Sequence, residues 1–127
     1  MITSGLVSIT FRQLSPAEIV RLVKRASLDG IEWGGDVHVP HGDLKKAREV
    51  FRMTADAGLS VLSYGSYYRV GEPETTPFDA IIDTALELHT NIIRIWAGQQ
   101  ASAEASSDYR KRVIDESRRI AALAAAK

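Results

Sequence analysis

The sequence predicts an α/β fold built from four successive βα units. Four short apolar segments begin roughly 30 residues apart, which is the size expected of one βαβ repeat. Each apolar segment is followed by a polar loop and then by a stretch with apolar residues at helical spacing. Strands that alternate with helices in this way form a parallel sheet with right-handed crossovers.

The composition limits the class of protein. The chain has 127 residues, of which 45% are hydrophobic and 25% charged, and this predicts a single globular domain over residues 1–127. Sixteen basic and sixteen acidic side chains balance, so we expect neither a nucleic-acid partner nor binding to an anionic membrane surface. No cysteine is present, and no apolar run reaches the ~20 residues of a membrane span. Because the N-terminus lacks the pattern of a signal peptide, we expect a cytoplasmic protein.

The first unit contains the clearest helix start. Residues 6–10 alternate with period two, which predicts a strand. Ser15 can cap the following helix, Pro16 suits its first position, and Glu18 can complete a capping box. Gly30 then permits a sharp exit from this helix into the next unit.

The second unit concentrates groups that carry chemistry. It begins with a short strand over residues 31–33 and continues through a glycine-broken loop into a helix over about 43–57. In parallel α/β folds the functional site lies at this carboxyl end of the strands. The polar side chains of this strand and loop are Glu32, Asp36, His38, His41 and Asp43.

The third and fourth units repeat the pattern. Residues 61–64 predict a strand that leads into a long irregular loop over 66–74, and Thr76 and Pro77 begin the next helix in the manner of the first. The fourth strand is expected over residues 92–96. The last helix is expected from about Ser107 to Ala125.

The strand residues separate into two sets. The residues expected to face the helices are Ile9, Ile31, Ile93 and Ile95. The residues expected on the opposite face are Ser8, Thr10, Glu32, Ser63 and Arg94. A charge buried on a sheet face that helices cover costs several kcal/mol unless it is paired, whereas the inner face of a barrel can be polar near its functional end. The polar set therefore favours a barrel over a doubly wound sheet.

Four units are half of a TIM barrel, since a complete (βα)8 barrel usually needs ~250 residues. An open half-barrel has two exposed strand edges and an uncovered inner face, and both favour association. We therefore predict that two chains close an eight-stranded barrel as a homodimer around a two-fold axis. Glu32 and Arg94 of both chains then form an alternating ring inside it. The competing interpretation is that the chain is a piece of a longer barrel.

Three segments carry a family resemblance: 29–34 (DGIEWG), 38–43 (HVPHGD) and 94–98 (RIWAG). They resemble the first half of xylose isomerase-like TIM barrels, the sugar phosphate isomerases and epimerases related to type IV apurinic endonucleases. The resemblance implies a divalent-metal cofactor and a small sugar or sugar phosphate as substrate. In that family the metal ligands, two Glu, an Asp and a His, come mainly from the fifth to eighth strands. Neither the metal nor its ligands can therefore be assigned from these four units.

Glu32 and His41 are the candidates for catalysis. Glu32 can act as a metal ligand or a general base, and a general base requires a raised pKa. The structural alternative for Glu32 is an ion pair with Arg94. For His41 the alternatives are metal binding together with the neighbouring His38, Asp36 and Asp43, a substrate or phosphate contact, and a hydrogen bond within its loop.

Four further residues are candidates for substrate binding. Arg94 can bind a carboxylate or phosphate in bidentate fashion, and His38 lies in the loop at the functional end of the strands. Tyr64 and Trp96 lie at strand ends, where they can either stack on a sugar face or pack in the core.

Two functions are consistent with these observations. The first is a self-associating half-barrel that is related to metal-dependent sugar isomerases and epimerases and lacks catalytic competence alone. The second is an active divalent-metal sugar isomerase or epimerase that works as a dimer.

Overall fold

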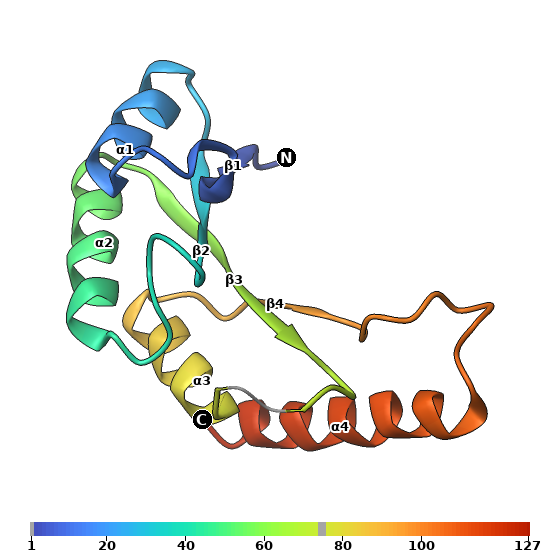
Figure 1. Ribbon diagram of the computed structural model, residues 1–127. Coiled ribbons are helices and arrows are strands. Elements are labelled where there is room, and N and C mark those ends of the chain that lie inside the picture. Colours follow the sequence, from blue (N-terminus) through green and yellow to red (C-terminus); the bar gives the residue numbers. More distant parts are fainter. Residues whose placement is uncertain (1, 74–75) are drawn as a thin grey trace.

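The computed structural model describes residues 2–73 and 76–127. Its four strands form one parallel sheet in the order β1-β2-β3-β4, which confirms the predicted α/β fold of βα units (Figure 1). The elements in chain order are β1 (Gly5–Val7), a 3-10 helix (Ser8–Phe11), α1 (Pro16–Arg25), β2 (Gly30–Gly34), α2 (Leu44–Asp56), β3 (Ser60–Arg69), α3 (Phe78–Glu87), β4 (Ile93–Trp96) and α4 (Ser107–Ala125).

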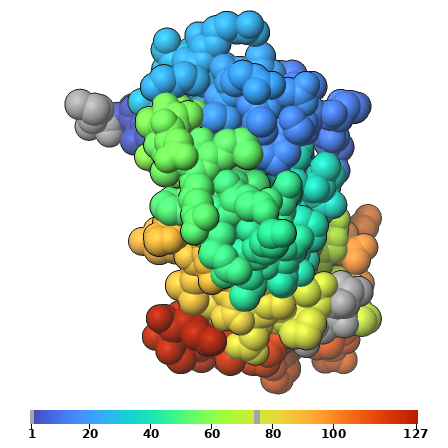
Figure 2. Space-filling view, turned by 90° about the vertical axis from the view of Figure 1, so that its left-hand side faces the viewer, coloured from blue at the N-terminus to red at the C-terminus, as the bar shows by residue number. Residues whose placement is uncertain are grey.

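The helices cover one side of the sheet. Helices α1, α2 and α3 lie along one face, and α4 packs beside α3 (Figure 1). Figure 2 shows this helical side from outside, with α1 uppermost and α2, α3 and α4 following in order. Within the described residues no α-helix lies on the other face of the sheet (Figure 1). This one-sided arrangement is half of a TIM barrel, and the uncovered side is called the open face below.

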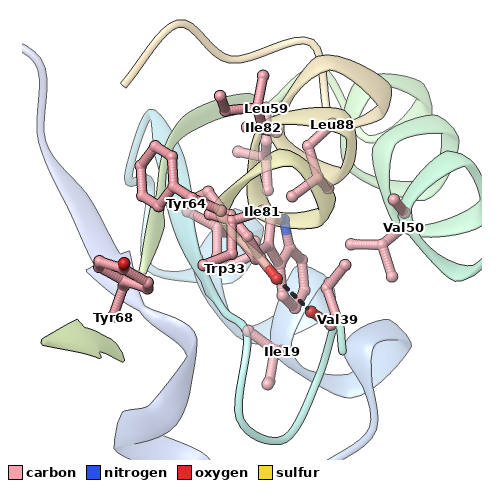
Figure 3. Packing of buried hydrophobic residues seen from close by; sticks show 14 of the residues in the cluster. Ile19, Trp33, Val39, Val50, Leu59, Tyr64, Tyr68, Ile81, Ile82 and Leu88 are labelled. Atoms are coloured by element: carbon pink, nitrogen blue, oxygen red, sulfur yellow. Dashed lines mark hydrogen bonds between the residues drawn. The ribbon is translucent and has the colours of Figure 1, made fainter. Parts of the chain in front are cut away.

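The core fills the space between the sheet and its helices. Trp33 on β2 and Tyr64 on β3 are neighbours in register and are fully buried (Figure 3). Trp33 Nε1 donates to Thr54 Oγ1 at 3.2 Å, and the Tyr64 hydroxyl donates to the Val39 carbonyl at 2.8 Å. Both aromatic residues therefore bury their rings without leaving a polar tip unpaired. The helices contribute Ile19, Val23, Ala47, Val50 and Ile81, and Leu88 follows directly after α3.

The predicted helix starts of α1 and α2 are confirmed. The Ser15 side chain accepts the Glu18 N–H, and the Glu18 carboxylate accepts the Ser15 N–H at 2.7 Å, which is a capping box. The Asp43 carboxylate caps α2 by accepting the Lys46 N–H at 2.9 Å. Helix α4 spans Ser107–Ala125, as predicted. None of the helices in the described chain has the length and apolar character needed to cross a bilayer.

The first strand is shorter than predicted. The prediction of a strand over residues 6–10 is wrong beyond Val7, because the backbone turns there into a 3-10 helix. Ser8, which was expected on the open face, is fully buried, and its hydroxyl accepts the Gly34 N–H at 2.9 Å. Val7 lies beside Glu32 in register, so these two residues share the open face. The predicted alternation, which placed Ile9 and therefore also Val7 toward the helices, is thus shifted by one residue.

The third strand is longer than predicted. The sequence indicated a strand over 61–64 and a loop over 66–74, but β3 continues to Arg69. It continues because β4 pairs with it as far as the Arg69 and Trp96 neighbours. Glu74, the last residue of the predicted loop, lies outside the described residues.

Two element starts differ from the prediction. Helix α3 begins at Phe78 with Pro77 as its N-cap and without a side-chain hydrogen bond there, so Thr76 is not the cap. Strand β4 begins at Ile93, and Ile92, which was expected to open it, is 55% exposed.

Candidate functional site

The parallel register places polar side chains from three neighbouring strands together on the open face. Glu32 on β2 lies beside Ser63 on β3, and Gly65 two residues later lies beside Arg94 on β4. Arg94 Nε donates to Glu32 Oε1 at 2.8 Å, and Ser63 Oγ donates to Glu32 Oε2 at 2.6 Å. Both carboxylate oxygens are therefore engaged, as the structural alternative for Glu32 anticipated.

Gly65 provides the space in which this ion pair lies. A β-carbon at Gly65 would lie 2.9 Å from Arg94 Nη2 and 3.0 Å from Glu32 Oε1. The Glu32 side chain is 14% exposed and that of Arg94 is 33% exposed, so the pair is shielded from solvent without being fully buried. Burial alone would lower the pKa of Arg94. The hydrogen bond to Glu32 and the charge of Glu32 together outweigh burial, so the pKa of Arg94 lies above its ordinary value. Arg94 is therefore a permanent cation.

Aromatic rings and further charges surround this pair at the carboxyl ends of the strands. The Arg94 guanidinium carbon lies 5.4 Å from the ring centres of both Tyr67 and Trp96. The Arg69 guanidinium carbon lies 5.6 Å from the Trp96 ring centre. These separations are typical of cation–π contacts. Trp96 is 42% exposed, so part of its ring is open to a ligand.

His38 lies inside the fold and not at the open face. It is 4% exposed, its Nδ1 lies 2.9 Å from Ser8 Oγ, and its Nε2 lies 3.2 Å from the Leu14 carbonyl. The carbonyl can only accept, so the proton lies on Nε2 and Ser8 donates to Nδ1. Burial lowers the pKa of His38, and weaker contributions from the Leu14 carbonyl and Asp36 oppose this. Both ring nitrogens thus connect the loop after β2 to the first unit.

His41 and Tyr64 form a second pair on the helical side of the sheet. His41 Nδ1 lies 2.7 Å from the Tyr64 hydroxyl, which itself donates to the Val39 carbonyl, so Nδ1 carries the proton. Gly35 packs against this pair, since a β-carbon there would lie 2.7 Å from the Tyr64 hydroxyl. Burial lowers the pKa of His41 and raises that of Tyr64 well above its usual value. Tyr64 is therefore a neutral core residue.

The structure separates the six candidate residues into two groups. The first group, on the open face, contains Glu32, Arg94 and Trp96. The second group, on the helical side, contains His38, His41 and Tyr64.

Sequence reasoning placed Tyr67 and Arg69 in a long loop over 66–74, where binding residues tend to gather, and missed that they continue β3 beyond Gly65 on the open face. The signal was the period of two along the chain, since Ser63, Gly65, Tyr67 and Arg69 are alternate residues.

The donor set does not fit the divalent metal that the family resemblance implies. Among residues 2–73 and 76–127, no three His, Cys, Asp or Glu side chains gather closely enough to hold a metal ion. The Glu32 carboxylate is already engaged by Arg94 and Ser63. Four-residue ligand sets are typical of such metal sites, so these units alone do not supply one.

No protein-family model matches the chain, and no curated protein matches it. Among solved structures, it resembles the probable 3-DHS dehydratase AsbF, involved in petrobactin synthesis, from Bacillus anthracis, with a TM-score of 0.76, 23% identity and coverage of 98% of this chain and 48% of that chain. A putative xylose isomerase from Rhodospirillum rubrum gives a TM-score of 0.74 at 16% identity, covering 99% of this chain and 50% of that chain. D-psicose 3-epimerase from Clostridium cellulolyticum H10 gives a TM-score of 0.71 at 11% identity, covering 98% of this chain and 49% of that chain.

The chain therefore has the fold of half of a TIM barrel, as these three solved structures do over the part that it matches. It spans about half the length of the solved structures it matches. At these identities the likeness establishes the fold, and the function has to be argued from the residues on the open face.

Proposed function

We propose that this chain is a self-associating half-barrel of the sugar isomerase and epimerase type, and that a second copy completes its eight-stranded barrel. The observation that carries the proposal is the open face, where an ion pair and polar side chains line a sheet that has helices on one side only. The structural neighbours include proteins described as a xylose isomerase and a D-psicose 3-epimerase, which supports this class.

Both edges of the sheet favour closure. Strands β1 and β4 are the two edge strands, and each presents backbone groups to a further parallel strand. A second copy related by a two-fold axis places its β1 beside β4 and its β4 beside β1, which removes both edges at once. The two Glu32–Arg94 pairs then lie in one neutral layer, and further desolvation strengthens their mutual attraction.

The surface beside β4 has the form that this arrangement requires. Helix α4 extends past the end of the sheet (Figure 1). A largely apolar hollow lies between α4 and the segment after β4, and its lining includes Ala97, Tyr109, Val113 and Ile114. In a complete barrel each helix packs against its own strand and the next one, so we place the next strand against this apolar side of α4.

The open face also has the groups that a small sugar needs. The exposed part of the Trp96 ring can stack on a sugar face, while Arg94 and Glu32 offer a donor and an acceptor for hydroxyl groups. Glu32 remains the candidate base, but it must first leave Arg94. His41 is the second catalytic candidate, and it has to act from the helical side of the loop after β2. The unpaired half-barrel is therefore expected to lack catalytic competence.

The test compares two exposed apolar side chains that differ in position. Ile114 on α4 is 50% exposed and lines the hollow between α4 and the segment after β4, whereas Leu86 on α3 is 49% exposed and does not line this hollow. Ile114→Glu should shift the monomer–dimer equilibrium toward the monomer by at least tenfold in sedimentation velocity, because a charge is then buried in the interface. Leu86→Glu should leave the equilibrium unchanged. An equal shift of the monomer–dimer equilibrium in both variants, or no shift in either, would contradict the proposal.

The second candidate function is an active metal-dependent isomerase or epimerase in the dimer, with ligands drawn from both copies. It is favoured by the acidic and aromatic groups at the carboxyl ends of the strands, which is where such barrels carry their sites. A metal that binds the folded dimer raises its melting temperature by mass action. Mn2+, Mg2+, Co2+ and Zn2+ should be tested separately, and the absence of any shift would eliminate this candidate.

A further inference from the structure

The large apolar side chains that the sheet leaves exposed are confined to its two edges. Val7 on β1 is 36% exposed, Trp96 on β4 is 42% exposed, and Ile92, which directly precedes β4, is 55% exposed. Within β2 and β3, all of whose residues the structure describes, no large apolar side chain is exposed to this degree. Exposed apolar side chains that gather in one region mark interaction surfaces. Here they gather on the strands that a second copy has to pair.

The register across the sheet defines which residue at the β4 edge is level with Val7. Val7 pairs with Glu32, and Glu32 pairs with Ser63. The residue after Ser63 pairs with Ile93, so Ser63 itself is level with Ile92. A line drawn straight across the strands therefore joins Val7 at one edge to Ile92 at the other.

A closed barrel does not join its edges along such a line. In an eight-stranded TIM barrel the strands are tilted, and the register is displaced by about eight residues over one full circuit. Each of two identical halves contributes half of this displacement, which is about four residues. Because residue 92 is level with residue 7 of its own chain, it is level with residue 3 or residue 11 of the second copy.

Only one direction of this displacement places strand beside strand. If residue 92 is level with residue 11, β4 (Ile93–Trp96) runs beside residues 12–15, which form the turn between the 3-10 helix and α1. If residue 92 is level with residue 3, β4 runs beside residues 4–7, which contain the whole of β1. Every residue of β1 then has a neighbour in β4 of the other copy.

We infer that the two copies close in this second register, so that Trp96 of each copy lies beside Val7 of the other. The inference rests on the proposed closure by a second copy, and it adds the register and the residue that each copy gives to the other. Val7 is level with Glu32 and therefore lies on the open face. The displacement is an even number of residues, so side chains of the open face meet side chains of the open face.

The site around Trp96 is then shared between the two copies. The proposed function assigns the exposed part of the Trp96 ring to a sugar face, and Val7 of the second copy borders the same ring. The contact removes apolar surface of both residues from water, which stabilises the closed barrel. A single copy leaves both side chains partly exposed, so its site is incomplete.

Disulfide cross-linking tests this register directly, because the chain has no cysteine of its own. Chains carrying Val7→Cys and chains carrying Trp96→Cys are mixed in equal amounts and oxidised. Neighbours on paired strands have Cα atoms about 5 Å apart, which a disulfide can bridge, whereas the same two positions within one chain are three strand spacings apart, about 14 Å. We expect a covalent dimer in the mixture and none in either variant alone.

Phe11→Cys is the matched control, because Phe11 is 37% exposed and Val7 is 36% exposed. Without a displacement between the copies, Trp96 would be level with Phe11 instead of Val7. The mixture of Phe11→Cys and Trp96→Cys should therefore cross-link about tenfold more slowly than the mixture with Val7→Cys. An equal or faster rate would overturn the register. Rapid cross-linking of a single variant with itself would also overturn it, since like edges would then meet.

The fluorescence of the unmodified chain provides a measurement that does not depend on the cysteine variants. Trp33 is fully buried in one copy, whereas Trp96 is not, so association should change the surroundings of Trp96 alone. We expect the emission to move to shorter wavelength as the concentration rises, and Trp96→Phe to abolish this shift.

Sedimentation velocity separates the failure of this inference from the failure of the proposed function. A dimer without the emission shift, or without a cross-link between Val7→Cys and Trp96→Cys, would overturn the register and leave self-association standing. A chain that stays a monomer at every concentration would overturn the proposed closure, and the register with it.

Discussion

The ion pair between Glu32 and Arg94 should contribute measurably to the stability of the fold. Removing one partner of a fully buried pair costs about 3–5 kcal/mol, whereas exposed pairs contribute about 0.2–1 kcal/mol. The Glu32 side chain is 14% exposed and that of Arg94 is 33% exposed, which places the pair between these limits. We therefore expect Glu32→Gln and Arg94→Met each to lower the free energy of unfolding by about 2 kcal/mol.

The double-mutant cycle isolates the interaction from the cost of each single change. The double variant should be more stable than the sum of the two single effects predicts, with a coupling energy of about 1 kcal/mol. Urea denaturation followed by circular dichroism measures this, since a loss of about 2 kcal/mol lowers the midpoint by roughly 1 M at an m-value of about 2 kcal/mol per M. All variants must be compared at one chain concentration, because self-association stabilises the folded state by mass action.

A surface pair provides the control for this cycle. Arg48 and Glu87 join α2 and α3 at the same 2.8 Å separation, but their side chains are 47% and 31% exposed. The coupling energy of this pair should be below about 0.5 kcal/mol. Simple additivity at Glu32 and Arg94, or a coupling no larger than that of the surface pair, would refute the argument that shielding on the open face strengthens the interaction.

Three further changes test individual elements. Ser15→Ala should lower the free energy of unfolding by about 1 kcal/mol, measured by thermal melting, because it removes the capping box of α1. Gly30→Ala should cost about 1–3 kcal/mol, since a β-carbon there would lie 2.4 Å from the Ser60 carbonyl, and a cost below 0.5 kcal/mol in urea would show that β2 and β3 are farther apart. Stability should fall from pH 7 to pH 5. The reason is that burial lowers the pKa of both His38 and His41 in the folded chain, so the unfolded chain, in which a histidine has a pKa of about 6.5, takes up these protons first. His38→Gln should flatten part of this profile and His41→Gln the rest, and an unchanged slope in both variants would locate the titrating group elsewhere.

Local capping chemistry explains why much of the fold could be predicted. Ser15 and Glu18 specify the start of α1 within four residues, and Asp43 does the same for α2, so no distant contact is needed to find them. The one-sided arrangement followed from Glu32 and Arg94, because charges on a strand are incompatible with helices on both faces.

The errors arose where tertiary contacts override the local pattern. Residues 6–10 alternate like a strand, but Ser8 turns inward to bond Gly34 and His38, which ends β1 early. Tyr67 and its neighbours resemble an irregular loop, yet pairing with β4 extends β3 to Arg69. Which residues share the open face could be predicted only in part, because it depends on a register that spans three strands.

The molar mass of the unmodified chain in solution tests the central claim most directly. Static light scattering across a dilution series should give about twice the 13.9 kDa of one chain at high concentration, and should fall toward the single-chain mass on dilution. A mass of one chain at every concentration would contradict closure by a second copy. A mass that rises without limit would instead indicate open-ended pairing of the two edge strands.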